Sequence, residues 1–181
     1  MYFVVPLILG GIMNSISSTY VRKRAEQRLS NPYTPLPDLL HDWFPKIPFL
    51  IPDYFLLWCT ALAVYNYSLL IEMENNILTM GLCSIIRSFS VCFTIMPTCM
   101  SRPVAKQSVY SKLFLNTHDL MFSGHSLFFI GIGNMLNSRI VATLGPFLLV
   151  VARQHYTIDV CVSGLVYFLI YTITTSENLF F

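Results

Sequence analysis

The sequence predicts an all-α, polytopic membrane protein with six transmembrane helices. Of its residues, 55% are hydrophobic and only 11% are charged, and the mean hydropathy of +0.61 is well outside the range of an ordinary soluble domain. A transmembrane helix needs about 20 mostly apolar residues. Six segments meet or approach that length: Tyr2–Tyr20, Tyr54–Glu72, Ile77–Pro97, Leu120–Leu136, Ile140–Val151 and Ile158–Thr174.

The first and fifth of these segments need separate justification. The first lacks the basic start and small-residue cleavage site of a signal peptide, so it is interpreted as a span. The fifth is short and reaches span length only with Arg139 and residues 152–154, and Gly145-Pro146 predicts a kink in it. No polar stretch is left for a soluble domain. We therefore expect one membrane-embedded catalytic domain over 1–175, and a tail at 176–181, within SENLFF, that partly resembles a protease-tag remnant.

Two long polar connections, Val21–Pro48 and Thr98–His118, lie on the same side of the membrane if there are six spans. In the first connection, Pro35, Pro37, Pro45 and Pro48 exclude a long regular helix. The fourth span begins near His125 and the fifth ends near His155, and both of these ends open onto the side of the two connections. The sequence thus predicts two histidines close to one interface and at similar depth.

The spacing of these histidines and an aspartate indicates catalytic chemistry. If the sixth helix begins near Gln154, His155 and Asp159 are one helical turn apart, and the carboxylate can orient one imidazole nitrogen while the other acts as nucleophile. His125, on a different helix, would be the general acid and base. The Ser123-Gly124 step before it allows close backbone approach, and the start of that helix can hold an anion such as phosphate.

Arg87 lies in the middle of the third span, where an unpaired guanidinium is expensive. It should face a polar cavity, and phosphate is a natural partner for it. Asp119, Arg153 and Tyr156 flank the histidines and are further candidates for orienting a head group. Less specific interpretations stay open, because intramembrane histidine and arginine can also be structural. His41 with Asp42, and His118, are interpreted as solvated loop residues.

Composition also limits cofactors and partners. The net charge of +2 and the scattered basic residues do not suggest nucleic-acid binding, whereas lipid head groups fit better as anionic partners. The five cysteines contain no Cys-x-x-Cys pair. No metal-ligand cluster is apparent, so neither a metal nor a cofactor is expected.

Two segments resemble the signature motifs of the sphingomyelin synthase family. DLMFSGHS (119–126) and HYTIDV (155–160) are similar to its Asp, three residues, Ser-Gly-His-Thr and its His-Tyr-Thr, one residue, Asp. PLPDLLHDWF (35–44) and RSFSVCFTIMPT (87–98) agree more weakly with two others in the same order. The family includes ethanolamine-phosphate transferring relatives and enzymes that exchange phosphocholine between phosphatidylcholine and diacylglycerol. The resemblance implies six spans and the lipid phosphatase fold.

The resemblance also implies a His-His-Asp triad, which maps onto His125, His155 and Asp159. His155 would attack the donor phospholipid to form a phosphohistidine, and His125 would protonate the departing diacylglycerol oxygen and then deprotonate the acceptor hydroxyl of ceramide or diacylglycerol. The implied location is the Golgi, the endoplasmic reticulum or the plasma membrane, with the site facing the lumen or cell exterior. The positive-inside rule favours the cytosol instead, because the loops on the histidine side hold most of the basic residues: Arg22, Lys23, Arg24, Arg28, Lys46, Arg102, Lys106 and Lys112.

Departures from related patterns leave the activity open. The motif of ordinary lipid phosphatases fails at Ile95 and Leu149, which favours transfer, whereas Ser126 and His118 depart from the synthase pattern and leave the head group and acceptor undecided. The leading hypothesis is a lipid phosphotransferase. A lipid phosphatase or phospholipase C-like hydrolase with the same triad is the alternative, and a non-catalytic lipid-binding protein is the third. Whether the chain forms a homo-oligomer stays open.

Overall fold

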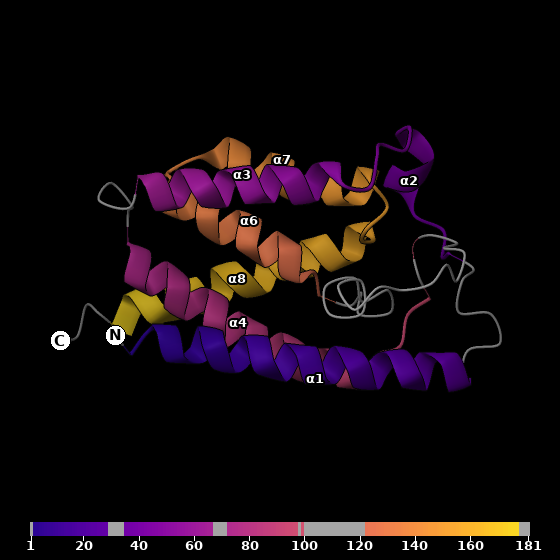
Figure 1. Ribbon diagram of the computed structural model, residues 1–181, viewed down its shortest axis with the longest axis horizontal. Coiled ribbons are helices and arrows are strands. Elements are labelled where there is room, and N and C mark those ends of the chain that lie inside the picture. Colours follow the sequence, from indigo (N-terminus) through magenta and orange to yellow (C-terminus); the bar gives the residue numbers. More distant parts are fainter. Residues whose placement is uncertain (1, 29–34, 67–71, 98, 100–121, 178–181) are drawn as a thin grey trace.

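The computed structural model describes residues 2–28, 35–66, 72–97, 99 and 122–177, and its regular secondary structure over these ranges is entirely helical (Figure 1). The predicted all-α class is therefore confirmed for this part of the chain. The helices are α1 (Val4–Arg28), α2 (Leu39–Trp43), α3 (Ile51–Tyr65), α4 (Met73–Phe93), α6 (Gly124–Met135), α7 (Arg139–Val151) and α8 (Thr157–Glu177).

Three of the described helices, rather than six, are long and apolar enough to cross a membrane. They are Val4–Ala25 within α1, the whole of α4, and Thr157–Ser176 within α8. The helices α3, α6 and α7 have 15, 12 and 13 residues, which is roughly 18–23 Å at 1.5 Å per residue and less than the hydrocarbon thickness. Six spans thus stay a prediction. The last helix, α8, continues through Glu177, and the division of the chain at residue 175 stays a prediction.

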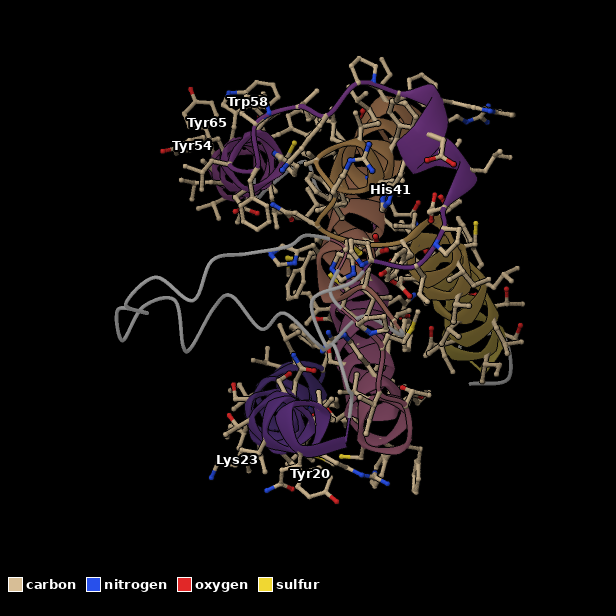
Figure 2. All side chains as sticks on the ribbon, turned by 90° about the vertical axis from the view of Figure 1, so that its right-hand side faces the viewer. Tyr20, Lys23, His41, Tyr54, Trp58 and Tyr65 are labelled. Carbon is tan, nitrogen blue, oxygen red and sulfur yellow. The ribbon has the colours of Figure 1, made fainter. Side chains whose placement is uncertain are left out.

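The outer faces of the long helices are apolar. Along α1, Val5, Ile8 and Ile12 are exposed, and along α8, Leu165 and Leu169 are exposed. Aromatic side chains also point outward from α3, among them Tyr54, Trp58 and Tyr65 (Figure 2). Apolar faces of this extent are rare on soluble monomers and are typical of helices that contact lipid.

The core forms around α6, which packs against α3, α4, α7 and α8. Its Leu127 and Phe129 are fully buried, and the Phe129 ring stacks on Phe55 of α3 with centroids 5.6 Å apart. In Figure 1, α3, α6 and α7 lie in the upper part of the view and α1 with α4 in the lower part, and α8 packs against α4, α6 and α7. The α6 N-terminus is thereby brought near the N-terminus of α8.

The contacts of α4 with α1 and with α8 are made by small and polar residues. Gly81 of α4 lies so close to α1 that a Cβ there would be 2.5 Å from the backbone nitrogen of Leu7, the kind of close approach that small residues permit in membranes. Between α4 and α8, the buried Tyr167 hydroxyl donates to Asn76 Oδ1 over 2.5 Å. Interhelical hydrogen bonds of this kind add directional specificity to apolar packing.

The segment Pro35–Leu50, which we call the strap, crosses the end of the molecule where α7 ends and α8 begins. As its prolines predicted, it contains no long helix, only the five-residue α2, whereas residues 21–28 of the predicted connection continue α1. Asp38 is the N-cap of α2 and accepts hydrogen bonds from the backbone N–H groups of Leu40 and His41. The strap connects α3 to the turn that carries His155.

Candidate active site

His155 lies in the turn between α7 and α8, not inside a helix. α8 begins at Thr157, one residue before the predicted span Ile158–Thr174, so the condition that the last helix begins near Gln154 is not met. The helix begins at residue 157 because the Asp159 carboxylate caps its first turn. Asp159 Oδ2 accepts from the backbone N–H of Tyr156, just before the helix, over 3.0 Å. His155 and Asp159 nevertheless lie together, with 3.6 Å between Nδ1 and Oδ2.

His125 is the second residue of α6 and faces His155. Their ring centroids are 6.2 Å apart with the planes inclined by 53°. The side chain of His125 is 41% exposed and that of His155 is 8% exposed. Ser123 is the N-cap of α6, accepts from the Ser126 N–H and fixes the helix start from which His125 projects. Two imidazoles at this separation can contact opposite sides of one phosphoryl group.

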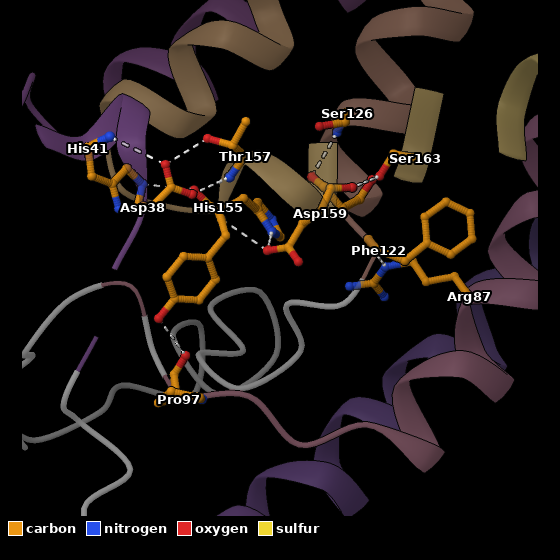
Figure 3. Close-up of polar contacts among 12 residues, drawn as sticks. Asp38, His41, Arg87, Pro97, Phe122, Ser126, His155, Thr157, Asp159 and Ser163 are labelled. Atoms are coloured by element: carbon orange, nitrogen blue, oxygen red, sulfur yellow. Dashed lines mark hydrogen bonds and ion pairs between the residues drawn. The ribbon is translucent and has the colours of Figure 1, made fainter. Parts of the chain in front are cut away.

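Buried polar atoms surround Asp159. The Ser163 hydroxyl donates to the Asp159 carbonyl oxygen over 2.6 Å and also lies 3.1 Å from the Ser123 carbonyl oxygen, which ties α8 to the start of α6 (Figure 3). Within the described part of the chain, Asp159 Oδ1 and Ser126 Oγ are buried without a hydrogen-bond partner. Such groups are costly in a folded core and are enriched at sites that bind or react.

Arg87 of α4 reaches the same region. Its Nε donates to the carbonyl oxygen of Phe122, and its Nη1 donates to Asn14 Oδ1 of α1. Its side chain is buried beside Gly124, where a Cβ would lie 3.4 Å from Arg87 Nε. The glycine predicted to allow close approach therefore admits the guanidinium to the N-terminal turn of α6.

Of the other predicted binding residues, Arg153 and Tyr156 are bonded to backbone groups of neighbouring segments. Arg153 donates to the His41 carbonyl oxygen over 2.5 Å. The Tyr156 hydroxyl donates to the Pro97 carbonyl oxygen over 3.2 Å and accepts from the Leu36 N–H. Burial raises the pKa of Tyr156 to about 12, so it stays a protonated donor at neutral pH. These contacts favour a structural role for both side chains, and Asp119 lies outside the described residues.

Two residues near the histidines were not anticipated as parts of a site. His41 was expected to be a solvated loop residue, but its side chain is buried and its Nε2 lies 3.2 Å from the His155 carbonyl oxygen, so that expectation was wrong. Asp53 of α3 has its Oδ1 4.0 Å from His125 Nε2 and accepts from Gln154 Nε2 over 3.1 Å. The PLPDLLHDWF segment was the only sequence pattern that indicated a role for the strap, and no local pattern indicated a role for Asp53.

No cluster of three or more His, Cys, Asp or Glu side chains in the described ranges could hold a metal ion. The chain matches no family model, no curated protein and no solved structure. The resemblance to the sphingomyelin synthases therefore stays an expectation drawn from short motifs. Any role for the site has to be argued from its own geometry.

Proposed function

We propose that this protein is a membrane-embedded lipid phosphotransferase. It moves a phosphocholine or phosphoethanolamine head group from a glycerophospholipid to the hydroxyl of ceramide or diacylglycerol, through a phosphohistidine on His155. The observation that carries the proposal is the placement of two imidazoles 6.2 Å apart, one of them next to a buried carboxylate. A phosphoryl group between them has a nucleophile on one side and a proton donor on the other.

The proposed reaction has two steps. His155 Nδ1 faces Asp159, so Nε2 is the nucleophile and forms a bond to phosphorus as the bond to the diacylglycerol oxygen breaks. Protonated His125 gives its proton to that oxygen. In the second step His125 takes the proton of the acceptor hydroxyl, whose oxygen attacks phosphorus as the P–N bond breaks. Both histidines return to their starting states, so no co-reactant is consumed.

Charges near the histidines fit these roles. The developing imidazolium of His155 is stabilised by Asp159, and the Asp53 carboxylate lies 4.0 Å from His125 Nε2, where it can pair with the imidazolium that His125 forms in the reaction. The guanidinium of Arg87 at the start of α6 can neutralise charge on the equatorial phosphoryl oxygens. Three span-length helices with apolar outer faces supply the membrane setting that a lipid substrate needs.

The test is transfer in reconstituted liposomes. The purified protein is supplied with phosphatidylcholine or phosphatidylethanolamine and with fluorescent ceramide or, separately, fluorescent diacylglycerol. We expect a labelled phospholipid or sphingolipid that disappears with His155→Ala and persists with the control Asp42→Asn, an exposed residue of the strap. Release of free head-group phosphate without a labelled lipid would identify the hydrolase instead, and no turnover with any pair would leave the binding protein.

A further inference from the structure

We propose that His41 of the strap is a positioning residue for the nucleophile His155. This inference rests on the proposed phosphotransferase function, and it assigns a task to a histidine that does not touch the reacting atoms. A bond between the His41 imidazole and the His155 carbonyl oxygen holds the turn that carries the nucleophile. The strap thereby helps to orient the His155 imidazole toward the phosphorus atom of the substrate.

One side of the turn is fixed by α7. The backbone N–H of Arg153 donates to the Val150 carbonyl oxygen over 2.8 Å, and that of Gln154 donates to the Leu149 carbonyl oxygen over 2.9 Å. Arg153 adopts a positive φ of 58°, the left-handed conformation that commonly ends a helix. These bonds stop at His155, whose own N–H lies 3.4 Å from the Leu149 carbonyl oxygen. Tyr156, between His155 and α8, is held by Asp159, and the His155 carbonyl oxygen has its partner in the strap.

The other side of the turn is fixed by the strap. Asp38 Oδ2 accepts from the backbone N–H of Thr157 over 2.7 Å, and its Oδ1 accepts from the Thr157 hydroxyl over 2.7 Å. The strap is also tied to Gln154, whose Nε2 donates to the Phe49 carbonyl oxygen over 2.6 Å. Figure 3 shows Asp38, His41 and Thr157 grouped beside His155. The strap thus binds residues before and after the nucleophile.

His41 and Arg153 form a reciprocal pair across this contact. His41 Nε2 lies 3.2 Å from the His155 carbonyl oxygen, and Arg153 Nη2 donates to the His41 carbonyl oxygen over 2.5 Å. A carbonyl oxygen can only accept, so the bond requires a proton on Nε2 of His41. The side chain is only 4% exposed, so water cannot readily replace it as the donor.

The consequence for catalysis is geometric. The His155 carbonyl belongs to the peptide whose N–H, on Tyr156, donates to Asp159. Fixing that peptide fixes the nucleophile and its carboxylate relative to each other. A displacement of about 1 Å at a reacting group can lower the rate roughly a hundredfold. Loss of the His41 bond should therefore lower kcat, while KM for the donor lipid changes little.

The experiment compares three substitutions in the full-length protein in liposomes. His41→Gln places an amide N–H near the position of Nε2, whereas the shorter side chain of His41→Asn carries the same amide but does not reach that position. His41→Phe removes the donor but keeps a ring next to Tyr156, whose ring centroid is 5.8 Å from that of His41. We expect kcat to fall about tenfold or more for Phe and Asn and to return close to the original value for Gln. Equal losses in all three, or no loss in Phe, would overturn the proposal.

A second readout does not depend on turnover. The rate at which diethyl pyrocarbonate modifies His155 is measured by mass spectrometry, with the more exposed His125 as internal reference. We expect His155 to be modified faster in His41→Phe and at the original rate in His41→Gln. Unchanged modification in His41→Phe overturns the positioning role even if no lipid is turned over. If the unsubstituted protein transfers no lipid head group but His155 is modified faster in His41→Phe, the proposed function is contradicted and the positioning role of His41 stands.

Discussion

The imidazoles of His125 and His155 face each other with their ring centroids 6.2 Å apart, although one begins α6 and the other precedes α8. The relationship depends on the contact between these two helix starts, which the Ser123 N–H reinforces by donating to the Asp159 carbonyl oxygen over 3.5 Å. A site built on two helix termini is sensitive to small shifts of either one. Substitutions at the residues that hold these termini should therefore change turnover.

Replacing Asp159 by Asn should abolish most activity without unfolding the protein. The amide oxygen can still accept from the Tyr156 N–H, but it cannot stabilise an imidazolium on His155. By analogy with triad carboxylates, we expect kcat for transfer to fall on the order of ten-thousandfold. Transfer rates and thermal unfolding are measured together, with Asp42→Asn as control. A variant with nearly full activity would show that Asp159 is purely structural.

Gly124→Ala should reduce activity while leaving stability intact or raising it. The added methyl group would contact Arg87 Nε at 3.4 Å, so the guanidinium must shift by a few tenths of an ångström. Alanine also favours a helix over glycine by up to about 1 kcal/mol. We expect a several-fold lower kcat with an unchanged or higher melting temperature.

The matched control for that substitution is Gly11→Ala in α1, where a Cβ would meet no atom within 4 Å. This variant should keep its activity. If Gly124→Ala is as active as Gly11→Ala, the position of the Arg87 guanidinium does not matter for turnover.

Asp38→Asn should destabilise the protein in a pH-dependent way. Burial raises the pKa of Asp38, but hydrogen bonds from Thr157 and the charge of His41 outweigh it and lower the pKa below the ordinary value of 3.8. A lowered folded-state pKa stabilises the fold above about pH 4, and that stabilisation is lost as the pH falls through the folded value. The difference in melting temperature between the two proteins should be full at pH 7 and shrink at pH 3. The exposed Asp42→Asn should show no such trend, and a difference for Asp38→Asn that is independent of pH would contradict this account.

Tyr167→Phe should weaken the contact between α4 and α8 without affecting the chemistry. It removes the buried bond to Asn76, and interhelical hydrogen bonds in membranes contribute about 0.6 kcal/mol on average and up to about 1.7 kcal/mol. We expect a lower melting temperature in detergent and unchanged kcat at 25 °C. Tyr65→Phe, at an exposed position on α3, should change neither, and a loss of kcat in Tyr167→Phe at unchanged stability would argue against a purely structural bond.

The number of spans can be decided by glycosylation mapping. If α6 and α7 each cross the membrane, an acceptor sequence inserted after Asn137, between them, lies on the opposite side from one inserted in the 98–118 connection. If the two helices, only 12 and 13 residues long, lie on one side of the membrane without entering it, both acceptor sites share that side. Modification of only one of the two acceptor sites is the outcome expected for six spans.

Local patterns in the sequence were sufficient to determine the helical class, the irregular strap and the pairing of His155 with Asp159. Apolar runs favour helices in a bilayer because backbone groups must bond internally. Prolines exclude a long helix from the strap, and His155 and Asp159, four residues apart, stay close even though His155 lies two residues before the start of α8. Each of these features depends on neighbours along the chain.

Tertiary packing decided the rest. The burial of His41, the approach of Asp53 to His125 and the partners of Arg87 all join segments that are far apart in sequence. A polar residue in a loop has the same local signature whether it is solvated or bonded to a distant carbonyl oxygen. Only the docking of the strap on the turn before α8, and of α3 on α6, buries His41 and gives these side chains their partners.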